Sequence, residues 1–496
     1  MNDALHPCFG FKIFGLCNYD PSGPASTYFS VGDAIAALAF TLAVQQFLKP
    51  IFIFRLNARG ISLFWLYGLV FCGFLSAMIA AVLPSLPIDR ELPFAYPIVW
   101  EIIGASLFAI SYGLLAFGSI WPLRIKEGQV PKFVKAAAGY LAEREEKDYV
   151  DLGREILRNL PELMNKASFI DHRWQRISAF YQFTHRKKIE DAAYASSLLR
   201  IMSDSRFCRT LIDGCPWLVD STIRTIAEKQ MTTSSAERFI QEISVQALQS
   251  DSGILAREMG YQGFSHAPVL SESLFSNFHI LQTFRPLSWL NLRNDQPLER
   301  GYLQRLGAAC EASYKTTINA REYWEVHHLH DLTEVYEDVF RELNRHHKNE
   351  NRDFRLILEA TQAVENVVEQ VRTHLSVMDH DVRNALYAHD GDPRSRFQLD
   401  IIDTAANLVC KCFFAVSNNF TGIDDPFWHF AIGLWMKLFP FHKNEAVGMD
   451  PLQQRVAILL REKIRDNMNG YYPAVLKIIL AVSGPYRSSV RINRTA

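Results

Sequence analysis

The sequence predicts a mainly α-helical protein, in which three transmembrane helices precede a large all-α cytosolic domain. Three long apolar segments lie before residue 125, and the pattern from about Pro131 onward is helical with few alternating positions. The chain has 496 residues, of which 49% are hydrophobic and 21% charged, so it can bury large cores. A formal net charge of -1 argues against a surface built to bind nucleic acid, which we do not expect as a partner.

Each of the three apolar segments is long enough to cross a bilayer. They run from Val31 to Phe54, from Ile61 to Leu83 and from Tyr96 to Trp121. A transmembrane helix needs roughly 20 apolar residues, and all three segments reach that length. The start, MNDALHPCFG, lacks the basic and then apolar pattern of a signal peptide, so we expect the first span to stay in the mature protein.

The basic residues around these segments predict an orientation. The loop between the second and third segments holds one arginine beside Asp89 and Glu91. Lysines and arginines cluster instead after the first segment and after the third: Lys49, Arg55, Arg59, Arg124, Lys126, Lys132 and Lys135. Short loops rich in Lys and Arg stay cytoplasmic, so we place the N-terminus outside a bacterial inner membrane and everything after Trp121 inside.

The cysteines are consistent with this orientation. Cys8 and Cys17 lie in the short outer segment, where an oxidising compartment makes them candidates for a disulfide. The cytosolic cysteines have no CxxC spacing, so we predict reduced, buried side chains for the following residues: Cys208, Cys215, Cys310, Cys410 and Cys412.

The third apolar segment carries Ala105, Ala109 and Gly113 at four-residue spacing. Small residues in such a stripe allow close helix packing, within one chain or between copies, so a homo-oligomer is expected. Gly118 lies off this row and is expected to tolerate a larger side chain better. The segments hold few polar residues, but a pore of oligomerised three-helix units remains an alternative.

The cytosolic part shows helix boundaries along its length. Ser234 and Glu237 are spaced as a capping box, and Asp450 precedes Pro451 at an N-cap. Further helical patterns run roughly over 299–317, 321–346, 353–377 and 397–414. The apolar stretch 428–442 is too short to span a membrane, so it is a buried helix or, alternatively, an interfacial one.

We divide the chain into four regions. These are an outer N-terminal segment (1–30), a three-helix transmembrane region (31–122), a cytosolic helical region (123–290) and a C-terminal cytosolic helical bundle (291–496). The last boundary follows Pro286 and irregular sequence around it. Walker, Rossmann, kinase, GxSxG and HExxH patterns are all missing from the sequence, so we expect no cofactor.

A metal site has only one candidate. His327, His330 and Asp331, followed by Glu334, can share one helix face, and imidazole and carboxylate groups are metal ligands. A second ligand cluster is not evident in the sequence. We therefore predict a solvated helix face and no bound metal.

The stretch RNALYAHDGD contains Arg383, Asn384 and His389. Over these seven residues it resembles the R-N-x(n)-H motif of HEPN-family ribonucleases. The resemblance implies a helical domain that pairs with a second copy, with the arginine holding an RNA phosphate and the histidine as acid or base. Two other pairs in this chain, Arg321 with His327 and Arg341 with His346, have similar spacing. The alternative is a helix end at which Arg383 pairs with Asp379 or Asp381.

These observations favour a non-enzymatic role. We expect a membrane-anchored sensor, scaffold or effector that binds a cytosolic partner through its helical domain. The expected partners are the lipid bilayer, further copies of the chain and an unknown cytosolic protein. A membrane-tethered HEPN-like ribonuclease and a subunit of an oligomeric pore are the two alternatives.

Overall fold

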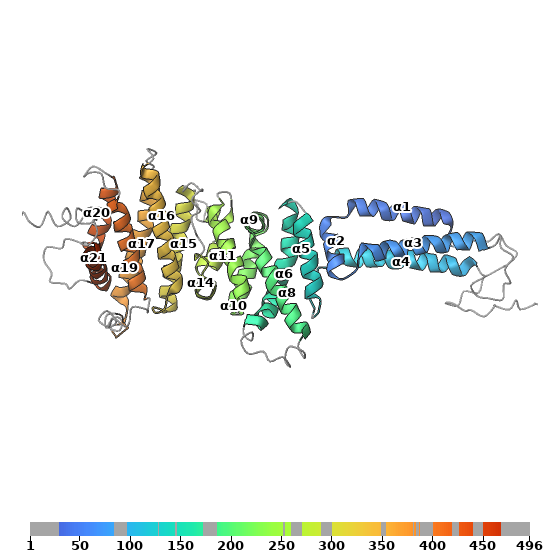
Figure 1. Ribbon diagram of the computed structural model, residues 1–496, viewed down its shortest axis with the longest axis horizontal. Helices are drawn as coiled ribbons and strands as arrows, with labels where there is room; N and C mark the ends of the chain where they lie inside the picture. The colour runs from blue at the N-terminus through green and yellow to red at the C-terminus, as the bar shows by residue number, and fades with distance from the viewer. Residues whose placement is uncertain are drawn as a thin grey trace, which may run out of the picture. The chain divides into compact units, whose positions relative to one another are not determined.

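The computed structural model describes a set of separate ranges. They are 29–83, 97–126, 128–143, 146–171, 186–250, 253–258, 270–288, 300–348, 354–379, 381–382, 386, 400–418, 426–439 and 450–467. Within these ranges the regular structure is helical and contains no strand, which confirms the mainly α prediction (Figure 1). The chain divides into two compact units, Met1–Leu123 and Arg124–Ala496.

The first unit contains four helices: α1 (Val31–Phe47), α2 (Pro50–Ala58), α3 (Leu63–Val82) and α4 (Pro97–Ile120). Two of them, over Leu63–Val82 and Pro97–Gly118, are long and apolar enough to cross a membrane. By length and composition these two helices favour membrane association, whereas α1 is apolar over a shorter stretch.

The prediction of one continuous helix over Val31–Phe54 is wrong, and the count of three spans is not confirmed. The chain breaks at Lys49, which is extended with φ of −59° and ψ of 143°, and Pro50 starts α2. Proline has no N–H to continue a helix, and its ring drives the preceding residue out of the α region. The break leaves α1 with 17 residues, fewer than the roughly 20 that a span needs.

Close approach between α3 and α4 depends on glycine. A Cβ atom on Gly104 would lie 3.1 Å from the backbone oxygen of Gly73, and one on Gly73 would lie 3.0 Å from the Phe108 ring. Next to this contact α1 contributes Ala34 to a small core with Val70 and Phe108, and Figure 1 shows α1 running beside α3.

Arg59 closes the other end of this unit. Its Nη1 donates to the carbonyl of Phe117 at 2.9 Å and its Nη2 to that of Trp121 at 2.6 Å. Both carbonyls lie at the C-terminal end of α4, where few backbone donors remain, although that of Phe117 also accepts from the Trp121 N–H at 3.4 Å. The guanidinium therefore ties the end of α2 to the end of α4.

The second unit begins with a set of shorter helices: α5 (Val130–Glu143), η3 (Glu146–Asp148), α6 (Tyr149–Asp171), α8 (Arg186–Met202), α9 (Ser205–Gly214), α10 (Pro216–Glu228), α11 (Ser234–Gln249), α12 (Ile254–Glu258), α13 (Leu270–Phe275) and α14 (Phe278–Phe284). The N-cap of α11 is Thr233, one residue before the predicted Ser234. Glu237 accepts instead from the amide of the buried Gln241, which also donates to the Phe284 carbonyl at 3.0 Å.

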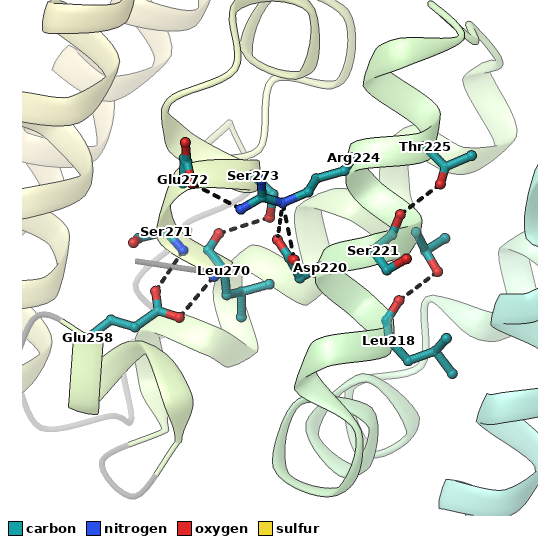
Figure 2. A network of polar contacts seen from close by, with 11 residues as sticks. Leu218, Asp220, Ser221, Arg224, Thr225, Glu258, Leu270, Ser271, Glu272 and Ser273 are labelled. Carbon is teal, nitrogen blue, oxygen red and sulfur yellow. Dashed lines mark hydrogen bonds and ion pairs between the residues drawn. The ribbon is translucent and has the colours of Figure 1, made fainter. Parts of the chain in front are cut away.

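Figure 2 shows how two carboxylates fix the short helix α13. Glu258 accepts from the backbone N–H groups of Leu270 and Ser271, both at 2.9 Å, and so caps the start of α13. Arg224 on α10 donates to Asp220 one turn earlier and, at 2.9 Å, to Glu272 on α13. The first interaction joins α12 to α13, and the second joins α10 to α13.

A helical bundle follows: α15 (Arg300–Ala320), α16 (His327–Lys348), α17 (Phe354–Val377), α19 (Ile401–Asn418), α20 (Pro426–Leu438) and α21 (Pro451–Asn467). The helix α15 packs on α17 and α16 on α19, around the buried rings of Tyr314 and Tyr336. The predicted start of α21 is confirmed: Asp450 and Gln453 cap it reciprocally, each backbone N–H donating to the other side chain at 2.9 Å.

The boundary predicted near residue 290 stays a prediction. Within the second unit, Arg305 of α15 donates from Nε to the Leu248 carbonyl at 2.6 Å, which links helices from either side of it. The predicted cytosolic cysteines are buried, as expected. Burial raises the pKa of the Cys215 thiol to about 11, so this side chain stays protonated at neutral pH.

Candidate functional site

Arg383, Asn384 and His389 lie outside the described residues, so the resemblance to HEPN ribonucleases stays a prediction. The described chain gives the two points between which this segment runs. The helix α17 ends before it at Val377 and α19 begins after it at Ile401, and of the residues between them the described Leu386 is buried. The bundle end around those two points is the candidate site.

A hydrogen-bonded tyrosine and histidine occupy this bundle end. The Tyr323 hydroxyl lies 2.9 Å from Nε2 of His374, and the two rings are 5.6 Å apart. His374 stands in the last turn of α17, and the carbonyl of Tyr323 accepts from the N–H of Ile401 at 3.0 Å. The pair therefore touches the chain on both sides of the segment that carries Arg383 and His389.

Arg321 lies two residues before Tyr323, at an unusual backbone turn. We call the group formed by Arg321, Tyr323 and His374 the corner. It follows α15 with a φ of 58°, its N–H donates to the Ile318 carbonyl, and the N–H of Glu322 donates to that of Thr317. This pattern is a Schellman motif, in which glycine usually holds the left-handed position. A non-glycine residue there costs about 1 kcal/mol. Glu325 in the same loop is also left-handed, with a φ of 55°.

The electrostatics of the corner favour an uncharged imidazole. Burial, together with the positive charge of Arg321, lowers the pKa of His374. Burial raises the pKa of Tyr323, whereas the charge of Arg321 lowers it. At neutral pH the corner therefore offers a neutral imidazole, a phenol and a guanidinium. These groups can accept a proton, donate a hydrogen bond and attract an anion, respectively.

The three candidate metal ligands are not brought together. Both carboxylate oxygens of Asp331 accept from the guanidinium of Arg285, with Nε at 2.5 Å from one of them. Nε2 of His330 lies 3.9 Å from Glu334, and His327 is exposed. In the described part of the chain, no group of three or more such side chains is placed to hold a metal ion.

His328 is a polar core residue that the sequence analysis did not single out. Its Nε2 lies 2.8 Å from Oγ1 of Thr317, and among the described residues its Nδ1 has no hydrogen-bond partner. The ring meets that of Phe278 edge-on at 6.0 Å. Burial, with smaller contributions from Arg285 and His327, lowers its pKa to about 4. The sequence signal for its burial was limited to its two neighbours at four-residue spacing, Trp324 and Leu332, which are both apolar.

Two residues of the small-residue stripe on α4 lie at the surface of the described chain, while Ala105 is half-buried, and its role in packing between helices stays a prediction. Ala109 and Gly113 are exposed, and a Cβ on Gly113 would meet nothing within 4 Å. The close contacts belong to Gly104, against α3, and to Gly118, where a Cβ would lie 2.1 Å from Cδ2 of Leu56. The expectation that Gly118 tolerates a larger side chain is therefore wrong, and the stripe stays available to lipid or another chain. The predicted disulfide partners Cys8 and Cys17 lie outside the described residues.

Comparison with known proteins gives this site no counterpart. No protein-family model, no curated protein and no solved structure matches the chain.

Proposed function

We propose that this chain is an integral inner-membrane protein whose helical region, from Arg124 onward, binds a cytosolic partner as a membrane-anchored sensor, scaffold or effector. One observation carries the proposal. Large apolar side chains are exposed along the helices of the first unit, including Phe64 at 80%, Trp65 at 69% and Phe71 at 59%. Water solvates such a surface poorly and lipid tails solvate it well, so a bilayer suits this unit.

The second unit contrasts with the first. Its described helices bury most of their large apolar side chains, and a few remain exposed: Ile201, Trp217, Leu358, Val377, Met436 and Ile458. Such scattered exposure is normal for a protein in water. The proposed orientation, with the N-terminus outside and the second unit in the cytosol, rests on the basic residues that follow the first and third apolar segments.

A cleft on the second unit supports the second part of the proposal, which is that this unit binds a protein partner. It has a volume of about 310 Å³ between α5, α6, α8 and α9 and is lined by apolar and aromatic side chains together with Asp204 and Arg206. The hydroxyl of Tyr149 donates to the Leu141 carbonyl at 3.1 Å, which holds one wall in place. Tyrosine, tryptophan and arginine dominate protein interfaces energetically, and Trp217 is 65% exposed on the same unit.

The experiment combines extraction with topology. Membranes from cells that produce the full chain are washed with alkaline carbonate, and a reporter active only in the cytosol is fused after Ala496 or between Pro84 and Pro93. We expect the chain to stay in the membrane pellet and only the C-terminal fusion to be active. Release into the supernatant, or the reverse fusion pattern, would overturn the proposal.

Phosphodiester cleavage is the second candidate function, and one observation favours it. The Tyr323–His374 pair lies beside both ends of the segment that carries Arg383 and His389, with the positive charge of Arg321 close enough to shift both pKa values. A guanidinium attracts a phosphate, and a neutral imidazole can accept a proton from an attacking hydroxyl.

Purified full chain, incubated with single-stranded RNA, tests this candidate. His389→Ala should abolish cleavage and leave the melting temperature within a few degrees of the parent, while His330→Ala, a half-exposed histidine on α16, should cleave normally. If the parent chain leaves RNA intact, or if both variants lose activity together with stability, the ribonuclease hypothesis is wrong.

A further inference from the structure

The second unit begins with an anchored backbone flanked by two cations. Ile125 is buried, and its N–H donates to Oδ1 of Asn159 at 3.2 Å. Arg124 and Lys126 on either side of it are exposed. The chain therefore enters this unit at a fixed place on α6, with two positive side chains at the surface.

The first turn of α8 adds three more exposed cations and no acidic residue: Arg186, Lys187 and Lys188. Contacts between α5 and α8 show that the two helices run in the same direction. The N–H of Gly128, just before α5, donates to Asp191 at 2.8 Å, and Nζ of Lys135 lies 5.7 Å from the Tyr194 ring centroid. Near the far ends, Leu141 and Ile201 line one cleft. The N-terminal ends of α5 and α8 therefore lie together, and we call the set of Arg124, Lys126, Arg186, Lys187 and Lys188 the basic end.

The three cations in the first turn of α8 oppose the dipole of their own helix. Helix N-termini carry partial positive charge, so cations in a first turn are repelled and acidic residues are preferred. The buried Asp191 already binds the Gly128 N–H and lies 3.7 Å from Lys166. Among the described residues of 124–143 and α8, Glu190 is the exposed carboxylate nearest to the cluster in sequence, while Glu127 lies outside the described residues. A first turn whose charges oppose the helix dipole breaks a local rule, and such breaks are typical of functional sites.

We propose that the basic end binds the anionic phospholipid headgroups of the bilayer in which α3 and α4 are anchored. This inference rests on the proposed membrane anchorage. Ile120 ends α4, and the four peptide steps to Arg124 span at most about 14 Å. Covalent reach therefore keeps the basic end beside headgroup phosphates, which favours lipid over any soluble polyanion. Lysines and arginines next to the membrane are attracted by the negative surface potential of the cytoplasmic leaflet.

Headgroup binding has a structural consequence. Two attachments, the covalent one through residues 121–123 and the electrostatic one through α8, restrict how the second unit turns on the membrane surface. The attachment through α8 should weaken with salt, because exposed charges are screened over about 10 Å at moderate ionic strength.

Hydrogen exchange of the full chain in lipid nanodiscs tests the inference. Discs contain phosphatidylcholine alone or with roughly 30% phosphatidylglycerol, a fraction that gives a strongly negative surface. We expect amides in the first turns of α5 and α8 to exchange about threefold or more slowly in the anionic discs, and this difference to vanish in salt on the order of 0.5 M.

Two variants of equal charge change provide the control. The first replaces cations of the basic end: Arg186→Gln, Lys187→Gln and Lys188→Gln. The second replaces exposed cations on α9 and at the end of α10: Arg206→Gln, Arg209→Gln and Lys229→Gln. Only the first should lose the difference between the two kinds of disc.

Two outcomes would overturn the inference. One is equal exchange in both kinds of disc for a parent chain that resists alkaline extraction, which leaves the proposed function intact. The other is protection in phosphatidylcholine discs on adding polyuridylate with none from phosphatidylglycerol, which would assign the surface to nucleic acid. Release of the chain by alkaline carbonate refutes the membrane anchorage instead, and the inference with it.

Discussion

At the scale of single residues, the functional signals are polar side chains that the core holds away from water. His328 and His374 both have lowered pKa values because burial disfavours the charged imidazole. Sequence alone marked the more exposed histidines of the same stretch, since spacing identifies a helix face but not which face is buried. The Tyr323–His374 pair joins residues 51 positions apart, so only the fold brings it together.

His328 makes the stability of the second unit dependent on pH. Its pKa is lowered from 6.5 to about 4, so the unfolded chain binds its proton at a higher pH than the folded one. The contribution of His328 to the free energy of unfolding is fully present above about pH 6.5. It falls as the pH drops toward 4, by about 2 kcal/mol between pH 7 and pH 5. Urea unfolding of the detergent-solubilised chain measures this, and His328→Gln should flatten the slope. If the variant keeps the same slope of unfolding free energy against pH, other titrating groups cause the pH dependence.

Two glycines of α4 should respond in opposite ways to enlargement. Leu56 is fully buried beside Gly118, so Gly118→Leu overpacks this contact and should cost about 1–3 kcal/mol. Gly113→Leu meets open space within the chain and should leave the stability of the monomer unchanged. Thermal unfolding and cross-linking of both variants separate the cases. Loss of oligomers with Gly113→Leu alone would show that a second copy covers the stripe.

At the scale of helices, the sequence predicted a helix boundary where the residue at that boundary strongly favours one position in a helix. Pro451 after Asp450 marked the start of α21 because proline suits the first helical position. Pro50 carried an equally clear signal, but hydropathy averaged over Val31–Phe54 concealed the break. The left-handed end of α15 at Arg321 has no sequence signal, since glycine is the usual residue there.

The cap on α13 gives a test at this scale. Glu258 supplies both oxygens to the Leu270 and Ser271 N–H groups, and such charge-assisted bonds contribute about 1.5–3 kcal/mol each at most. Glu258→Gln keeps the shape but loses the charge and one acceptor. We expect a loss of roughly 1 kcal/mol in the free energy of unfolding and faster amide exchange in α13. Exchange that accelerates equally across α16 would instead indicate global destabilisation.

At the scale of the whole molecule, composition predicted the class better than the site. Long apolar segments favour membrane association and helical periodicity predicts a helical region, because both signals depend on local sequence. The site depends on which helices meet, and nothing in the order of α15, α17 and α19 along the chain specifies that Tyr323 contacts both His374 and Ile401. The same limit applies to the basic end, whose cations come from segments about 60 residues apart.

The contrast in exposed surface between the two units leads to a final prediction. A chain that starts at Arg124 keeps the cores of the second unit, including Phe133, Leu160 and Leu211, and loses the exposed apolar helices α3 and α4. We expect residues 124–496 to be produced in the soluble fraction, with a helical circular dichroism spectrum and a cooperative thermal transition. The full chain should require detergent under the same conditions, because water solvates α3 and α4 poorly. Aggregation of the fragment with retained helicity would show that the second unit also buries apolar surface against the membrane or against another copy.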